Sequence, residues 1–333
     1  MTRKPFRQCL AALVAAAAVG LAGPALAQSA ADRAVEAAKQ YSGETLNVTW
    51  EAGLQALDPL NFSGPLWEEL TGVKINVIEV PISELFTKTV AEHRAGTGAY
   101  DLLNVVPAWM PDLVNAGVLA PLDEYVDKYG YRDELQDIAP TYRDNQMMVN
   151  GKIYGLPDDG DVLVLYYRTD LFGDADHQAA YKEKTGADLA PPKTWEEFYQ
   201  ISEYFNGVDG LNGSALIHAP GLVHYLFLQR FRTDGGKLFD GDMAAQINGD
   251  VGVGVLEDMV RQLDNMPQGA AGWGPIEVLN SWLAGDLSMI IWWPPPGRWS
   301  AGYGADQEAL SWLPKSTVAG NVGYALPPGG HPE

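Results

Sequence analysis

The stretch that decides the fold of this chain reads Gly151-Lys-Ile-Tyr-Gly-Leu-Pro-Asp-Asp-Gly-Asp-Val-Leu-Val-Leu-Tyr-Tyr-Arg-Thr-Asp170. Gly155 and Pro157 indicate a tight turn, because glycine tolerates unusual backbone angles and proline restricts its own. Residues 162–167 have the apolar composition of a buried strand. Between turn and strand lies an acidic loop with three carboxylates: Asp158, Asp159 and Asp161. Such a segment can cross between two lobes while presenting carboxylates to a ligand.

The N-terminus has the pattern of a secretory signal peptide. Basic residues precede an apolar run at 10–21, and Ala25-Leu-Ala27 stands before Gln28. We expect cleavage after Ala27, and therefore a periplasmic protein. A membrane anchor is the alternative, but it needs about 20 strongly apolar residues, and this run is short and rich in alanine. The only cysteine, Cys9, lies inside this segment, so the mature chain should contain none.

Length and charge narrow the possible functions. Roughly 300 mature residues can form two hydrophobic cores. Without residues 1–27 the chain has 19 basic and 43 acidic residues, a net charge of −24. Nucleic acids and anionic lipids bind basic surfaces, so neither is an expected partner. The acidic balance itself has two explanations, solubility outside the cytoplasm or a cationic ligand.

The first half of the mature chain alternates strands with helices. We expect strands over residues 45–50, 73–80 and 101–106, with helices over 65–70 and 83–95 between them. Two shorter helices should follow. This alternation predicts an α/β fold in which a mainly parallel sheet is covered on both faces.

Capping signals mark several expected helix starts. Ser83 and Asp123 are candidate N-caps, and Thr194 with Glu197 predicts a capping box before an amphipathic helix. The second half of the chain should then form two more helices and a buried strand, over residues 251–263, 276–284 and 287–292.

Candidate ligand contacts follow the expected strands, because open α/β sheets bind ligands beyond the carboxyl ends of their strands. Trp50 and Glu51 follow the first strand, and Trp109 follows the third. After residues 287–292 comes the proline-stiffened loop Trp293-Pro-Pro-Pro-Gly-Arg-Trp299. Aromatic faces stack on the apolar face of a sugar ring, and carboxylates and guanidinium groups hydrogen-bond to hydroxyls. Each tryptophan could instead fill a core.

Six short motifs occur in order along the chain: Ala99-Tyr-Asp-Leu-Leu-Asn-Val-Val-Pro-Ala-Trp109, Gly117-Val-Leu-Ala-Pro-Leu-Asp123, Gly151-Lys-Ile-Tyr-Gly-Leu-Pro157, Leu165-Tyr-Tyr-Arg-Thr-Asp170, Pro192-Lys-Thr-Trp-Glu-Glu-Phe198 and Leu283-Ala-Gly-Asp-Leu-Ser-Met289. This order resembles family 1 extracellular solute-binding proteins, the sugar-binding receptors of ABC importers. The resemblance implies a type II periplasmic binding protein fold. Two lobes, each with a mainly parallel sheet flanked by helices, would close on a sugar or oligosaccharide and deliver it to a membrane permease.

The resemblance also assigns candidate contacts one residue at a time. Asp161 matches a position where maltose-binding relatives place a sugar-binding carboxylate, and Asp159 is its nearest competitor. The remaining candidates face the cleft from the first lobe (Trp50, Glu51 and Trp109) or from the second (Trp293, Arg298 and Trp299). The triple proline departs from the maltose-binding pattern, which leaves open which aromatic ring stacks on the ligand.

The resemblance further implies a domain order. The expected units are a signal peptide, a first lobe, a second lobe and a returning segment, over residues 1–27, 28–160, 161–326 and 327–333. In the family the chain continues after a strand resembling residues 322–327, whereas this sequence stops at Glu333. We therefore expect a C-terminally truncated chain with an incomplete first lobe, rather than a shorter family member.

Other function classes are weighed on the same residues. A glycoside hydrolase could use Glu51 and Asp161 as paired carboxylates, and a polyamine receptor would suit the acidic charge. The five histidines show no metal-ligand spacing, and His218 and His224 are expected to be surface or core residues. We found no nucleophile elbow and no phosphate-binding loop. The sequence thus predicts a monomeric binding protein without enzymatic activity, cofactor or metal.

Overall fold

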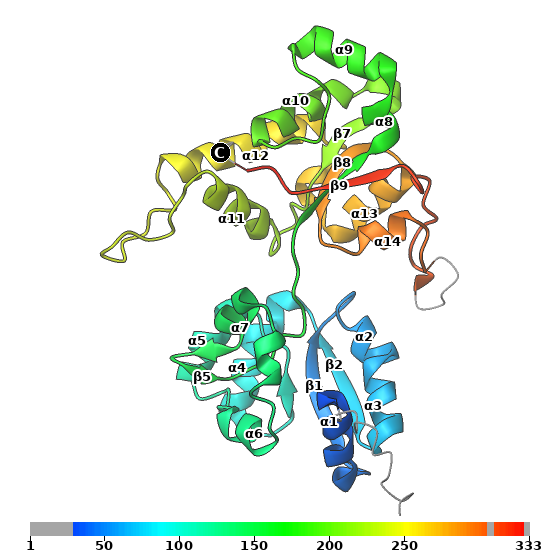
Figure 1. Cartoon of the computed structure of the whole chain (residues 1–333). Helices are drawn as coiled ribbons and strands as arrows, with labels where there is room; N and C mark the ends of the chain where they lie inside the picture. Colours follow the sequence, from blue (N-terminus) through cyan, green and yellow to red (C-terminus); the bar gives the residue numbers. More distant parts are fainter. Residues whose placement is uncertain (1–28, 305–309, 330–333) are drawn as a thin grey trace, which may run out of the picture.

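The computed structural model describes residues 29–304 and 310–329. It has two lobes, and the chain crosses between them through the segment before β6 (Figure 1). The expected signal peptide and Cys9 lie outside the described residues. Among the residues that the structure describes, no helix is long and apolar enough to cross a membrane.

The first lobe is built on a three-stranded parallel sheet in the order β2-β1-β3. Its strands are β1 (Thr45–Glu51), β2 (Lys74–Val80) and β3 (Leu102–Leu103). A separate antiparallel pair joins β4 (Met148–Val149) and β5 (Lys152–Ile153). The helices are α1 (Ala30–Ala38), α2 (Leu57–Asn61), α3 (Ser63–Thr71), α4 (Ile82–Ala95), α5 (Met110–Asn115), α6 (Asp123–Lys128) and α7 (Pro140–Gln146).

The second lobe has a four-stranded mixed sheet in the order β7-β8-β6-β9. The strands are β6 (Val164–Arg168), β7 (Asn212–Ala215), β8 (Leu287–Trp292) and β9 (Val322–Ala325). The helices are α8 (Thr169–Gly173), α9 (Ala175–Thr185), α10 (Trp195–Phe205), α11 (Val223–Thr233), α12 (Asp250–Gln262), α13 (Pro275–Ala284) and α14 (Pro296–Ser300).

The α/β class is confirmed, but the strand directions expected for the second lobe are wrong. There β7 and β8 are parallel, whereas β6 is antiparallel to both of its neighbours, β8 and β9. Helices connect β7 to β8, which is the kind of connection that parallel strands require. Strand β6 instead follows the segment that crosses between the lobes, and it pairs antiparallel with β8.

Several predicted boundaries also need correction. Ser83 does not cap α4, because the helix begins at Ile82, directly after Pro81. Asp123 lies inside α6, and its carboxylate accepts a hydrogen bond from the backbone N–H of Ile153 at 3.0 Å. The third strand is shorter than expected, and the chain leaves the sheet ahead of Pro107, whose nitrogen carries no hydrogen to donate.

The second half of the chain matches its expected elements more closely. The capping box of Thr194 and Glu197 is present at the start of α10. Strand β8 has the expected bounds and is buried along its whole length. The proline-rich segment after β8 is not only a loop, because Pro296–Ser300 forms the short helix α14, and proline is well suited to the first turn of a helix. These elements enclose two hydrophobic clusters in the second lobe.

Candidate functional site

The acidic loop of the crossing segment is bound by side chains of the first lobe. Gln55, just after β1, donates a hydrogen bond to the Asp159 carboxylate at 3.0 Å. Asn104, just after β3, donates to the Asp158 carboxylate at 3.1 Å. The carboxyl ends of two neighbouring parallel strands therefore meet the acidic loop, at the edge where open α/β sheets bind ligands.

The third carboxylate of the loop, Asp161, and the nearby Glu51 carboxylate have no partner within residues 29–304 and 310–329. Neither of these two side-chain carboxylates accepts a hydrogen bond or forms an ion pair there. Asp161 keeps access to solvent, yet desolvation by the surrounding protein raises its pKa to about 6, and the negative charge of Asp159 adds to the effect. Burial also raises the pKa of Glu51, again with a contribution from Asp159.

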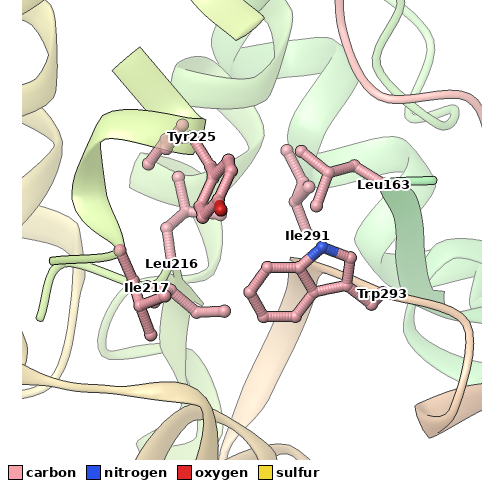
Figure 2. A pocket seen from close by; sticks show the side chains of 8 residues that line it. Leu163, Leu216, Ile217, Tyr225, Ile291 and Trp293 are labelled. Atoms are coloured by element: carbon pink, nitrogen blue, oxygen red, sulfur yellow. The ribbon is translucent and has the colours of Figure 1, made fainter. Parts of the chain in front are cut away.

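An apolar recess of the second lobe adjoins these carboxylates. Figure 2 shows the rings of Tyr225 and Trp293 bordering it. The centroids of the two rings are 6.4 Å apart and their planes are nearly perpendicular. Burial raises the pKa of Tyr225, and the charges of Glu51 and Asp161 raise it further, so this ring lies within electrostatic range of both carboxylates.

The two lobes also touch beside the recess. Leu54, in the turn after β1, packs against the second-lobe cluster that includes Trp292 and the partly buried Trp293 and Leu222. A first-lobe side chain thus packs against a second-lobe cluster that includes Ile217, which also lines the recess. Groups from both lobes are therefore available to one ligand.

The structure brings together four of the residues selected from the sequence, Glu51, Asp159, Asp161 and Trp293. Tyr225 was not selected from the sequence. It lies on α11, which follows β7. The sequence of β7, Asn-Gly-Ser-Ala, lacks the β-branched and aromatic residues typical of strands, so this strand was not predicted. Had that strand been recognised, the rule that ligands bind at strand ends would have pointed to the start of α11.

The other selected residues are not brought to these carboxylates, and three of the four pack against other side chains. Trp50 is half-buried and lies within β1 rather than after it. Trp109 packs edge-on against Phe86, with ring centroids 5.6 Å apart. The Arg298 guanidinium lies 4.8 Å from the centre of the Tyr303 ring.

Trp299 packs against two other indole rings. Its centroid is 6.0 Å from that of Trp292 and 5.6 Å from that of Trp312, and it belongs to the rim of a hydrophobic cluster. These contacts favour a packing role for Trp299 over ligand binding.

In the part of the chain that the structure describes, no group of three or more His, Cys, Asp or Glu side chains could hold a metal ion. His218 is buried, and its Nδ1 lies 3.1 Å from the Leu216 carbonyl. Burial lowers the pKa of His218, so the imidazole is neutral at pH 7. It is a core residue, one of the two roles expected for it.

Comparison with curated proteins gives relatives of low identity. A protein of Sinorhizobium fredii described as a probable amino-acid ABC transporter periplasmic-binding protein is 24% identical over 299 residues. The match covers 88% of this chain but 65% of that relative, so the chain spans slightly less than two thirds of its length.

Solved structures share the fold. A solute-binding protein of Agrobacterium radiobacter K84, in complex with ribitol, superposes with a TM-score of 0.70 at 24% identity, covering 87% of this chain and 67% of that one. A second, from Agrobacterium vitis S4 with bound D-mannitol, has a TM-score of 0.66 at 22% identity, covering 86% and 64%. Both are solute-binding proteins of ABC transporters, and the type II periplasmic binding protein fold is thereby confirmed.

The family of this chain is identified by a match over most of its sequence. The family model described as bacterial extracellular solute-binding protein matches residues 43–333, which include both lobes and the crossing segment. Its members are binding proteins rather than enzymes, which removes the support for a glycoside hydrolase. The chain belongs to the bacterial extracellular solute-binding protein family.

Proposed function

We propose that this protein captures a sugar or polyol between its lobes and delivers it to the permease of an ABC transporter. It would act in the periplasm, as a monomer, after cleavage of residues 1–27. The observation that carries this proposal is the pair of partnerless carboxylates, Glu51 and Asp161, beside the recess that contains Tyr225 and Trp293. Carboxylates accept hydrogen bonds from hydroxyl groups, and the rings pack on C–H surfaces.

The position of the site explains how a ligand would change the conformation. Glu51 belongs to β1 in the first lobe, whereas Tyr225 and Trp293 belong to the second. A ligand that contacts both groups binds the closed arrangement more tightly than the open one. It therefore shifts the population towards closure, the form in which a receptor presents its cargo to a permease.

Calorimetric titration with ribitol, D-mannitol, lactose and maltose tests the proposal. At least one of these should bind and raise the melting temperature, and the recovered ligand should be chemically unchanged. Failure of all four to bind would contradict the choice of ligand class, and hydrolysis of a bound disaccharide would contradict the receptor role.

Replacing Asp161 with asparagine should weaken binding of the preferred ligand by about tenfold or more. A hydrogen bond to an ionised acceptor contributes roughly 1.5–3 kcal/mol, and the amide supplies a weaker acceptor. Asp242→Asn is the matched control, because this exposed carboxylate accepts no hydrogen bond among the described residues. Equal affinities in the two variants would exclude Asp161 as a ligand contact.

Binding should also depend on pH. Asp161 must be ionised to accept two hydroxyl donors, so affinity should fall as the pH decreases through about 6. The stability of the unliganded protein should change in the opposite direction. Because the pKa is raised from 3.8 to about 6 on folding, protonation of Asp161 stabilises the fold fully below pH 3.8, and this contribution is lost as the pH rises through about 6. Titrations and melting curves between pH 4 and 8 would reveal both trends, and Asp161→Asn should reduce them.

A second candidate ligand is a solute that carries an amine. Glu51, Asp158, Asp159 and Asp161 form no ion pair with a described lysine or arginine, and the Sinorhizobium fredii relative is described as an amino-acid receptor. Binding of a cation to this cluster would weaken steeply with added salt, whereas binding of a neutral polyol would not. Titrations of spermidine and D-mannitol at two salt concentrations separate the candidates.

A further inference from the structure

We propose that Tyr142 is a positioning residue that attaches the acidic loop to the first lobe, so that the lobes rotate about Val162 and Leu163. This inference rests on the proposed binding function, because it concerns how the Asp161 carboxylate is held in place for a ligand. It adds a residue to which the sequence analysis assigned no role.

The contacts of Tyr142 carry the proposal. Tyr142 lies on α7, and its hydroxyl is shared between the carbonyl oxygens of Gly160 and Asp161, at 2.9 and 3.1 Å. Its ring lies over Gly160, where an added Cβ atom would be 3.4 Å from the nearest ring atom, an ordinary van der Waals contact. The ring therefore packs against the backbone of the loop, and the hydroxyl fixes the two peptide units that orient Asp161.

Tyr142 acts together with the two amide side chains described above. Gln55 holds Asp159 and Asn104 holds Asp158. All three anchors lie in the first lobe, and together they bind each residue from Asp158 to Asp161. The acidic loop should therefore move with the first lobe as a single body.

The first strand of the second lobe begins only a few residues later. Val164 is the first residue of β6 and is paired with Trp292 of β8. Between the two attachments lie Val162, which is 55% exposed, and Leu163. No described side chain hydrogen-bonds to the backbone of either residue. The Leu163 side chain packs against the second-lobe core, so the rotation is left to the backbone dihedral angles of Val162 and at the start of Leu163.

This division determines which groups approach each other on closure. The carboxylates of Glu51 and Asp161 would travel with the first lobe, and the rings of Tyr225 and Trp293 with the second. A ligand would be compressed between an acidic face and an aromatic face. If Tyr142 released the loop, the Asp161 carboxylate would no longer be held in its partly desolvated position.

The test compares Tyr142→Phe with Tyr125→Phe, an exposed tyrosine on α6 that serves as the control. Spin labels on Glu69→Cys and Glu183→Cys, in α3 and α9, report the distance between the lobes, and Cys9→Ser removes the native cysteine. Tyr142→Phe should broaden the distance distribution of the unliganded protein and weaken D-mannitol binding by about fivefold, which corresponds to the loss of one hydrogen bond.

A pH profile separates positioning from simple destabilisation. In Tyr142→Phe, the midpoint of affinity against pH should move below the value of about 6 set by Asp161, because the released carboxylate regains solvent. An unchanged distance distribution and an unchanged midpoint would overturn the proposal, even if the melting temperature falls. If the unaltered protein binds neither a sugar nor a polyol, the proposed function fails, and the distance distributions of the two variants still decide whether Tyr142 holds the loop.

Discussion

Replacing Arg230 with alanine should lower the free energy of unfolding by about 2–5 kcal/mol, the usual range for truncating a large buried side chain to alanine. Arg230 lies on α11 and is 1% exposed. Its guanidinium lies 4.2 Å from the centre of the Trp195 ring and donates to the Tyr199 hydroxyl and to Gln262 Oε1. Alanine would leave a cavity and remove the donor from both buried acceptors.

Arg261 provides the matched control, because it stacks on the same tyrosine from the exposed side. Its guanidinium lies 4.3 Å from the centre of the Tyr199 ring and pairs with Glu196 and Asp258, but about half of the side chain is in solvent. Arg261→Ala should cost less than about 1 kcal/mol. Urea denaturation of both variants measures the difference. Similar losses would show that the buried network contributes no more than a surface ion pair.

The contrast between these arginines illustrates what sequence patterns reveal. Residues 45–50 and 287–292 were predicted as strands because their composition is strongly apolar or β-branched, and helix α10 was predicted from the capping box of Thr194 and Glu197. These are local signals. Arg230 gives no local signal of burial, because its partners come from α10 and α12, which are distant in sequence.

The candidate site shows the same limit. Glu51 and Asp161 could be selected because strand ends and the crossing segment are recognisable in the sequence. Tyr225 and Tyr142 could not, since their importance depends on which residues of the other elements they contact. Trp299 was selected by its motif, and its motif does not reveal that Trp292 and Trp312 surround it.

Replacing Gly213 with alanine should lower the free energy of unfolding by at least about 3 kcal/mol, because overpacking against backbone atoms cannot be relieved by a side-chain rotation. Gly213 lies in β7, close to Ser202 of α10. An added Cβ would lie 1.9 Å from the Ser202 carbonyl oxygen and 2.5 Å from its hydroxyl. The helix would have to move away from the sheet, breaking the 2.8 Å hydrogen bond between the Ser202 and Ser214 hydroxyls.

The same substitution at Gly254 is the control. Gly254 lies in α12, and a Cβ there would meet no atom within 4 Å, so alanine should stabilise the protein by up to about 1 kcal/mol through its better helix propensity. Thermal and urea denaturation should therefore show effects of opposite sign, and a neutral Gly213→Ala would mean that α10 and β7 are not tightly packed at this position.

Gly213→Ala should also affect the candidate site, because β7 leads directly into Leu216 and Ile217 of the apolar recess. If α10 displaces β7, the recess wall moves relative to Trp293, and ligand affinity should fall together with stability.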